Sequence, residues 1–184
     1  MSEAIAWVSL DEFLAGEERS ERRHELVGGR VYVMAGGTER HDLAAGLLYE
    51  QVAGPARTAG CRPFISNRLV HTRHDASYYP DVMVVCEPAP HRLYETDPTL
   101  VIEVLSRSTA DTDRREKALA YAASPTLRQL LLVDPDTRRI EVAQRSDIGL
   151  AWKVYGPGDV IVTDYGAIDI EAFYEQLDSI ATTS

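Results

Sequence analysis

Cysteine and long apolar runs are both scarce in this sequence. Only two cysteines, Cys61 and Cys86, occur in 184 residues, and no zinc-binding spacing joins them to other cysteines or to histidines. We therefore expect both to be small core residues of a protein in a reducing, cytoplasmic compartment. No apolar run approaches the roughly 20 residues that span a membrane, and the charged N-terminus lacks the apolar centre of a signal peptide. These shortages argue against a disulfide-rich secreted scaffold, a zinc protein and a membrane protein.

Lysine is also scarce. The chain has 17 arginines but only two lysines, Lys117 and Lys153, and its net charge is −10. A large non-specific nucleic-acid surface needs dense positive charge, so such a surface is not expected, although a local basic cleft is compatible with this composition. Genomic bias toward arginine codons explains most of the imbalance. A retained lysine still raises a question, because a buried ammonium can lose its proton and a guanidinium cannot.

Length and hydrophobic content indicate one domain with a sizeable core. With 45% hydrophobic residues, we expect residues 1–184 to form a single domain, with a short helical segment over residues 1–24 packed on it. Sequence patterns predict helices at 9–15, 39–53, 112–123 and 170–180, a helix end at 24–27, and strands at 30–35, 61–73, 82–86, 99–105, 127–145 (as a hairpin) and 151–156. This order predicts a mixed α/β fold, α+β-like, in which helices flank a mixed sheet.

Two carboxylates interrupt the apolar strands. In "YYPDVMVVCE", Asp81 precedes the buried run 82–86, and in "LVIEVL" Glu103 lies between core-like residues. Buried neighbouring carboxylates lose hydration and repel each other unless a cation joins them. Mg²⁺ would relieve both costs, because it commonly binds one or two carboxylates and keeps several waters. Taken singly, Asp81 is explained by a turn or cap, and Glu103 by a solvated strand face.

A lysine follows on the next predicted helix. Asp113, Lys117 and Tyr121 are spaced i, i+4 and i+8, so they share one helix face if the helix includes Asp113. If Asp113 is instead the N-cap, with Glu116 as its capping-box partner, only Lys117 and Tyr121 share that face. Lys117 alone is explained as a solvated helix residue. Together, the strand aspartate, strand glutamate and helix lysine offset one another's electrostatic cost, which favours a functional site.

These motifs resemble a known nuclease superfamily. The stretch "PDVMVV…LVIEVLSRSTADTDRREKALAY" is similar to the PD-(D/E)xK nucleases and, more narrowly, to a bacterial family of restriction-endonuclease-like proteins, and the resemblance extends from about His24 to Tyr174. It implies a restriction-endonuclease-like core and an endonuclease that uses Mg²⁺ or Mn²⁺, and no organic cofactor, to hydrolyse phosphodiester bonds in DNA. Cutting both strands further implies a homodimer.

The resemblance assigns roles to individual residues. Asp81 and Glu103 become the metal ligands and, with Lys117 and Glu25, the catalytic residues. The superfamily lysine normally lies two residues after the acidic one, where this chain has Leu105, so Lys117 is interpreted as the lysine relocated to the helix. Glu25, in "HELVGGR", is expected to reach the site from the N-terminal helix.

Two further residues, Tyr121 and Asp113, are expected to support the ligands. The chain departs from the family pattern at His24, Gly28 and Arg107, where the family has Tyr, Asp and Pro. Arg107 could contact a phosphate, although a solvated arginine is the simpler interpretation.

Other candidates and other functions are weaker. His41 is expected to be a core or supporting histidine and not a ligand, and the stretch 36–38 (Gly-Gly-Thr) lacks the Lys-Ser/Thr of a P-loop. The alternative to an enzyme is a catalytically inactive DNA- or partner-binding protein that keeps the fold, which the net charge of −10 favours. A third hypothesis is a structural protein whose carboxylates pair with Arg114 or Arg115.

Overall fold

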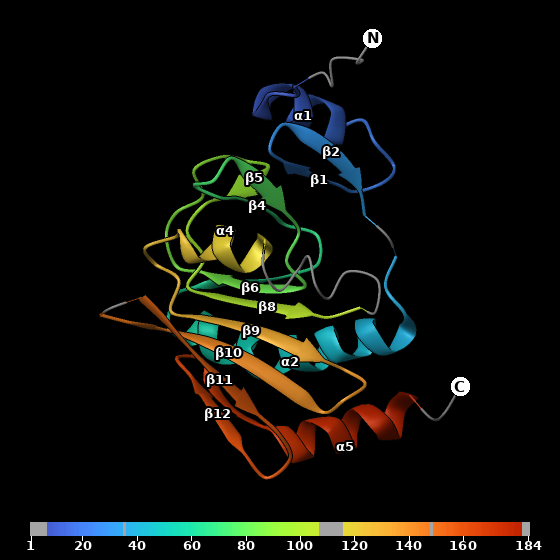
Figure 1. The fold of residues 1–184 in the computed structure, drawn as a ribbon, viewed down its shortest axis with the longest axis vertical. Coiled ribbons are helices and arrows are strands. Elements are labelled where there is room, and N and C mark those ends of the chain that lie inside the picture. Colours follow the sequence, from blue (N-terminus) through green and yellow to red (C-terminus); the bar gives the residue numbers. More distant parts are fainter. Residues whose placement is uncertain (1–6, 35, 107–115, 148, 182–184) are drawn as a thin grey trace.

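The computed structural model describes residues 7–34, 36–106, 116–147 and 149–181 (Figure 1). Its helices are α1 (Leu10–Glu17), α2 (Glu39–Thr58), α4 (Ala118–Ala122) and α5 (Ile170–Ala181). Its strands are β1 (His24–Val27), β2 (Arg30–Val33), β3 (Arg62–Ile65), β4 (Leu69–His71), β5 (Ala76–Tyr78), β6 (Val82–Val85), β7 (Tyr94–Glu95), β8 (Leu100–Val104), β9 (Gln129–Asp134), β10 (Arg139–Ser146), β11 (Gly149–Tyr155), β12 (Val160–Thr163) and β13 (Gly166–Asp169). None of the described helices combines the length and apolar character of a membrane-spanning segment.

A six-stranded mixed sheet forms the centre of the fold. Its strand order is β11-β10-β9-β8-β6-β3, and β8 and β9 are its parallel pair. Strands β6 and β8 are buried along their whole length, as expected for apolar strands that are covered on both faces. Helices α2 and α5 lie on one face (Figure 1), where Leu48 and Phe173 belong to the same buried cluster as Ile102 of β8.

Helix α4 and a smaller sheet cover the opposite face. The smaller sheet has the order β2-β1-β5-β4-β7. Tyr78 of β5 and Tyr121 of α4 share a buried cluster with Met83 and Val101 of the large sheet, and Phe13 of α1 packs in a third cluster on the smaller sheet. The predicted mixed sheet with flanking helices is therefore confirmed.

Most predicted helices and strands are present, with shifted ends. Ser9 and Glu12 form a capping box at the start of α1, the helix predicted at 9–15. Helix α2 continues to Thr58, beyond the predicted end at residue 53, although Pro55 lies inside it. Ala56 is fully buried in the core there, so tertiary packing outweighs the low helix propensity of the Gly-Pro pair.

The helix end predicted at residues 24–27 is wrong, because these residues form β1. Gly28 and Gly29 have φ values of +53° and +72°, and β1 pairs with β2 with Val27 opposite Arg30. Positive φ at both central residues is what a tight two-residue hairpin turn requires, and glycine adopts it without steric cost. Glu25 therefore approaches the site from a strand and not from a helix.

The expectation of two free core cysteines is also wrong, since Cys61 and Cys86 form a disulfide. Arg62 pairs with Val85 in the antiparallel β3–β6 pair, so the cysteines that flank these residues lie opposite each other. Their Cα atoms are 4.1 Å apart. Cys61 is buried and Cys86 is exposed. The strand register brings the two thiols together, and composition alone could not show it.

Reduction of this disulfide is expected to lower the free energy of unfolding. The two cysteines are separated by 25 positions in the sequence, and closing such a loop in the unfolded chain stabilises the native state by about 3 kcal/mol in the chain-entropy description. Urea unfolding with and without a reductant measures the difference. The double variant Cys61→Ser/Cys86→Ser is the control and should not respond to the reductant. Equal midpoints for the oxidised and reduced parent protein would contradict the crosslink.

Candidate active site

Two carboxylates lie opposite each other on neighbouring strands. Strands β6 and β8 pair antiparallel with Val82 opposite Ile102, so the register places Asp81, one residue earlier, opposite Glu103. Side chains at opposite positions point to the same face of a sheet, and this is the face that α4 covers. The side chain of Asp81 is 15% exposed and that of Glu103 is 6% exposed. Strand pairing therefore brings together the two acidic residues that the sequence analysis selected.

A main-chain amide and a histidine hold Asp81. The N–H of Val104 donates to Asp81 Oδ2 at 2.7 Å, and His41 Nε2 lies 3.3 Å from the same oxygen. His41 belongs to the first turn of α2, where its own N–H donates to the side-chain oxygen of Thr38. The hydrogen bond to Asp81 raises the pKa of His41 to about 9, although burial acts in the opposite direction.

The turn before α2 leaves room for the His41 ring only because residue 37 is glycine. A Cβ atom at Gly37 would lie 2.8 Å from His41 Nδ1 and 2.7 Å from Asp42 Oδ1. The Gly-Gly-Thr stretch, which lacks the P-loop pattern, thus lies against His41, a contact that no local sequence pattern reveals.

Glu103 is held from the helix that covers the sheet. The hydroxyl of Tyr121 donates to Glu103 Oε1 at 2.6 Å, and Lys117 Nζ lies 4.0 Å from the same oxygen. Burial is the larger cause that raises the pKa of Tyr121 well above its usual value, and the nearby charge of Glu103 is the second. The phenol therefore keeps its proton and remains a donor that fixes the orientation of Glu103.

Lys117 connects the site to the smaller sheet. Its Nζ lies 2.8 Å from Glu25 Oε1 of β1 and 5.4 Å from the ring centre of Tyr78, and its side chain is 12% exposed. An ammonium over an aromatic face is attracted by the ring quadrupole. Lys117 is therefore a largely buried cation between two carboxylates and an aromatic ring, and not a solvated helix residue.

Asp113 lies outside the described residues, and so do Arg107, Arg114 and Arg115. Of the predicted helix at 112–123, the structure describes residues from 116 onward, with α4 over Ala118–Ala122. The structure thus brings together Asp81, Glu103, Lys117, Glu25 and Tyr121 and adds His41 to them.

The carboxylate oxygens suit a small, hard divalent cation. Within the described ranges, no group of three or more His, Cys, Asp or Glu side chains is arranged to hold a metal ion. Mg²⁺ does not need such a group, because one or two carboxylates commonly bind it while water and substrate phosphate complete its shell. Asp81 and Glu103, opposite each other at low exposure, fit this type of site.

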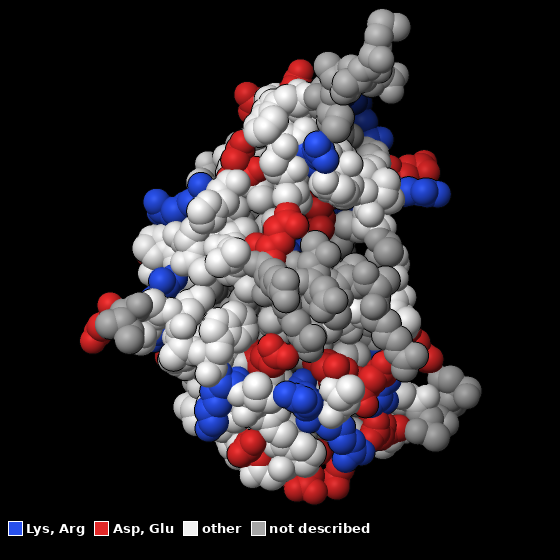
Figure 2. Space-filling view, in the orientation of Figure 1, with Lys and Arg blue, Asp and Glu red and all other residues white. Residues whose placement is uncertain are grey.

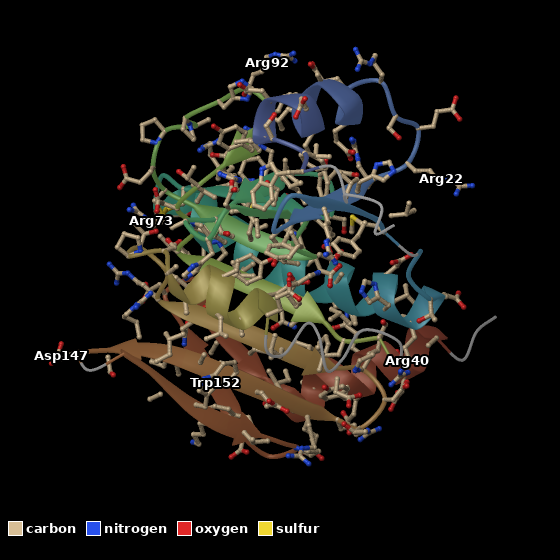
Figure 3. The ribbon with its side chains drawn as sticks, turned by 45° about the horizontal axis from the view of Figure 1, so that its top comes forward. Arg22, Arg40, Arg73, Arg92, Asp147 and Trp152 are labelled. Carbon is tan, nitrogen blue, oxygen red and sulfur yellow. A yellow bond between two sulfur atoms is a disulfide. The ribbon has the colours of Figure 1, made fainter. Side chains whose placement is uncertain are left out.

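Charges of both signs share the face of the molecule that Figure 2 shows. Figure 2 shows Asp and Glu atoms near the middle of this face, and Lys and Arg atoms interspersed with acidic ones below them. Figure 3 shows Arg22, Arg73 and Arg92 pointing outward at the periphery of the molecule. The described part of this face therefore carries no continuous basic surface.

Comparison with known proteins connects this geometry to a family. A family model named Uma2, described as "Putative restriction endonuclease", matches residues 10–165. Two proteins of Synechocystis sp. (strain ATCC 27184 / PCC 6803 / Kazusa) are similar. "Uncharacterized protein slr1290" is 31% identical over 88% of this chain and 82% of that protein, and "Uncharacterized protein sll1609" is 30% identical over 73% and 78%.

A solved structure has the same fold. It is described as a "putative nuclease belonging to DUF820 from Anabaena variabilis ATCC 29413" and superimposes with a TM-score of 0.76 over 92% of this chain and 99% of that chain. The sequence identity is 18%, so the likeness supports the fold alone.

In the metal-free protein, the imidazole of His41 is expected to titrate with a pKa of about 9. Because this value lies above the ~6.5 of an unfolded chain, the contact with Asp81 stabilises the fold fully below pH 6.5 and loses its contribution as the pH rises through about 9. NMR titration of the ring in the presence of a chelator measures the pKa. The variant Asp81→Asn is the control and should show a lower value. An ordinary pKa in the parent protein would contradict the contact.

Proposed function

This chain belongs to the Uma2 family of restriction-endonuclease-like proteins, and from that premise we propose that it is a Mg²⁺-dependent phosphodiesterase that cuts DNA. The observation that carries the proposal is the position of Asp81 opposite Glu103, with Lys117 Nζ 4.0 Å from Glu103 Oε1. Two carboxylates can hold a metal that activates water for phosphodiester hydrolysis, and a lysine beside them can stabilise negative charge in the transition state.

Asp81 and Glu103 are the residues that would hold the metal. A bound Mg²⁺ would lower the pKa of a coordinated water and offset charge on the scissile phosphate. His41 keeps the Asp81 carboxylate in one orientation, and Tyr121 does the same for Glu103. Both carboxylates are therefore oriented before any ligand arrives, which reduces the reorganisation that binding requires.

Lys117 is the residue proposed to act on the attacking water. Its ammonium can donate a hydrogen bond to that water, or to the negative oxygens of the phosphorane-like transition state. Glu25, 2.8 Å from Nζ, limits the positions that the flexible lysine can occupy.

The second candidate is a catalytically inactive DNA- or partner-binding protein with the same fold. The net charge of −10 favours its partner-binding form, because any complex with DNA must overcome this repulsion. The buried lysine and its two carboxylates favour the enzyme, since a protein that only binds DNA has no need of this expensive arrangement. A cleavage assay together with a metal-binding measurement distinguishes the two.

Purified protein is expected to nick or linearise supercoiled plasmid when Mg²⁺ or Mn²⁺ is added, and a chelator should stop the reaction. Asp81→Asn should lose activity by on the order of 10²–10³-fold, because it removes a charge that stabilises the transition state through the metal. Calorimetry should show weaker Mn²⁺ binding by this variant. Asp164→Asn is the matched control, since Asp164 pairs with Arg128 at an exposed position, and it should remain active.

An inactive parent protein that binds DNA and a metal would support the binding protein instead. A ligand that binds only the folded state raises the melting temperature. If the melting temperature of the parent protein stays constant up to high millimolar Mg²⁺, Asp81 and Glu103 do not bind the metal and have a structural role only.

Lys117→Arg and Lys117→Met are each expected to lose on the order of 10²–10⁴-fold in rate. The planar guanidinium cannot occupy the position of the ammonium between Glu25 and Glu103, and methionine carries no charge. Mn²⁺ affinity should be unchanged in Lys117→Arg and equal or higher in Lys117→Met, since that variant removes a nearby positive charge. Lys153→Arg changes the other lysine and serves as the control. Full activity of Lys117→Arg would exclude the lysine from the mechanism.

A further inference from the structure

The large sheet ends in a long, open edge strand. β11 is the outermost strand next to β10, with seven residues, and Trp152 and Val154 are each 48% exposed. The opposite edge is β3, a strand of four residues that contains Pro63. Short strands and proline protect sheet edges from pairing. β11 is longer and has no proline, and its single charged side chain, Lys153, lies over the ring of Tyr155 in the same strand, so β11 is the edge of this sheet better able to accept another strand.

The main-chain groups of every second β11 residue point away from the sheet. The N–H of Arg145 in β10 donates to the carbonyl of Arg128, so the main-chain groups of Arg145 point toward the β9 side. The main-chain groups of the residue before Arg145, of the residue after it, and of every second residue from these therefore point toward β11. Their partners in β11 include Ala151 and Lys153. The residues between these partners direct their N–H and C=O groups outward. These are Leu150, Trp152 and Val154, and no hydrogen bond found among the described residues engages them outside β11.

The side chains of β11 form an apolar face and an opposite face that carries one lysine. Trp152 lies opposite Ala143, which belongs to the buried cluster beside α4, so Leu150, Trp152 and Val154 share that face of the sheet. Figure 3 shows Trp152 on this surface, away from the core beneath α4. On the other face, Lys153 Nζ lies 4.1 Å from the ring centre of Tyr155 in the same strand. The strand contains no acidic residue, although the chain contains 29.

We propose that β11 pairs antiparallel with β11 of a second copy of this chain, on a twofold axis at Trp152. Trp152 is the middle residue of the seven, so Trp152 then faces the partner's Trp152, and Leu150 faces the partner's Val154. Ala151 faces the partner's Lys153, which keeps the two lysines from lying opposite each other. The outward main-chain groups of the three apolar residues form hydrogen bonds across the axis in this register.

The residue pattern of β11 indicates that the strand pairing with its open edge comes from a second copy of this chain and not from a different chain. Read outward from Trp152 in both directions, the strand has Ala and Lys, then Leu and Val, then Gly and Tyr. Apolar side chains therefore meet apolar side chains about the twofold axis, and an uncharged residue meets each lysine. A twofold interface requires this self-complementarity. Acidic side chains would repel between two chains of net charge −10, and the strand has none.

Self-pairing uses no residue of the candidate active site. In the sheet order, β10 and β9 separate β11 from β8, which carries Glu103. The interface therefore takes no residue from the site, and the proposal stands whether or not the protein cuts DNA.

Sedimentation or light scattering of the full chain at micromolar concentration is expected to give a dimer of the 20.4 kDa chain. Trp152→Glu places two carboxylates opposite each other on the axis and should shift the protein to monomer, while its far-UV spectrum remains that of the parent and shows that the chain still folds. Trp152→Thr is the uncharged control and should weaken the dimer less. A monomeric parent protein, or a dimer that Trp152→Glu leaves intact, overturns the proposal.

Crosslinking tests the register itself. Directly opposed residues of a hydrogen-bonded antiparallel pair have Cα atoms about 5.5 Å apart, within the range of a disulfide. Trp152→Cys should therefore form a covalent dimer on mild oxidation. Lys153→Cys is the matched control, because two copies of that position would be roughly 8 Å apart and on the other face. Equal crosslinking by both variants, or none by Trp152→Cys, contradicts pairing on Trp152.

Discussion

The burial of two opposed carboxylates is the constraint on which this structure depends. Asp81, just before β6, lies opposite Glu103 of β8, in a sheet that is covered on both faces, so each loses hydration and each repels the other. A fold gains nothing from this arrangement unless other groups offset the cost. The groups that do so are the Val104 amide, the His41 ring, the Tyr121 hydroxyl and the Lys117 ammonium. They orient the carboxylates as well as stabilising them, which is the requirement of a metal site.

The smaller sheet positions Lys117 in this arrangement. Its β1–β2 hairpin supplies Glu25, which contacts Lys117, and its β5 supplies Tyr78, whose ring lies below the ammonium. The lysine therefore sits between the two sheets, and its position depends on both. A change in the Gly28-Gly29 turn would alter the β1 register and move Glu25, so the hairpin is coupled to the chemistry although it contributes no metal ligand.

The sequence predicted the strands of the site better than their surroundings. Asp81 and Glu103 could be selected because a charged residue within a buried apolar run is locally visible. The contact of His41 with Asp81 joins positions 40 residues apart, and the pairing of Cys61 with Cys86 depends on strand register, so neither follows from local pattern. For residues 24–27, the Gly-Gly pair that follows them is the local signal of the β1–β2 hairpin. Asp113 stays a prediction, since it lies outside the described residues.

The central claim is that Asp81 and Glu103 together bind a divalent cation. Anomalous diffraction from crystals soaked in Mn²⁺ tests it most directly, because the scattering identifies the ion without reference to activity. The account predicts a single strong anomalous peak between the two carboxylates, with oxygen ligands at the short distances of a hard cation, and no such peak in crystals of Asp81→Asn. A peak elsewhere on the molecule, or side chains of Asp81 and Glu103 that keep only protein partners at saturating Mn²⁺, would contradict it.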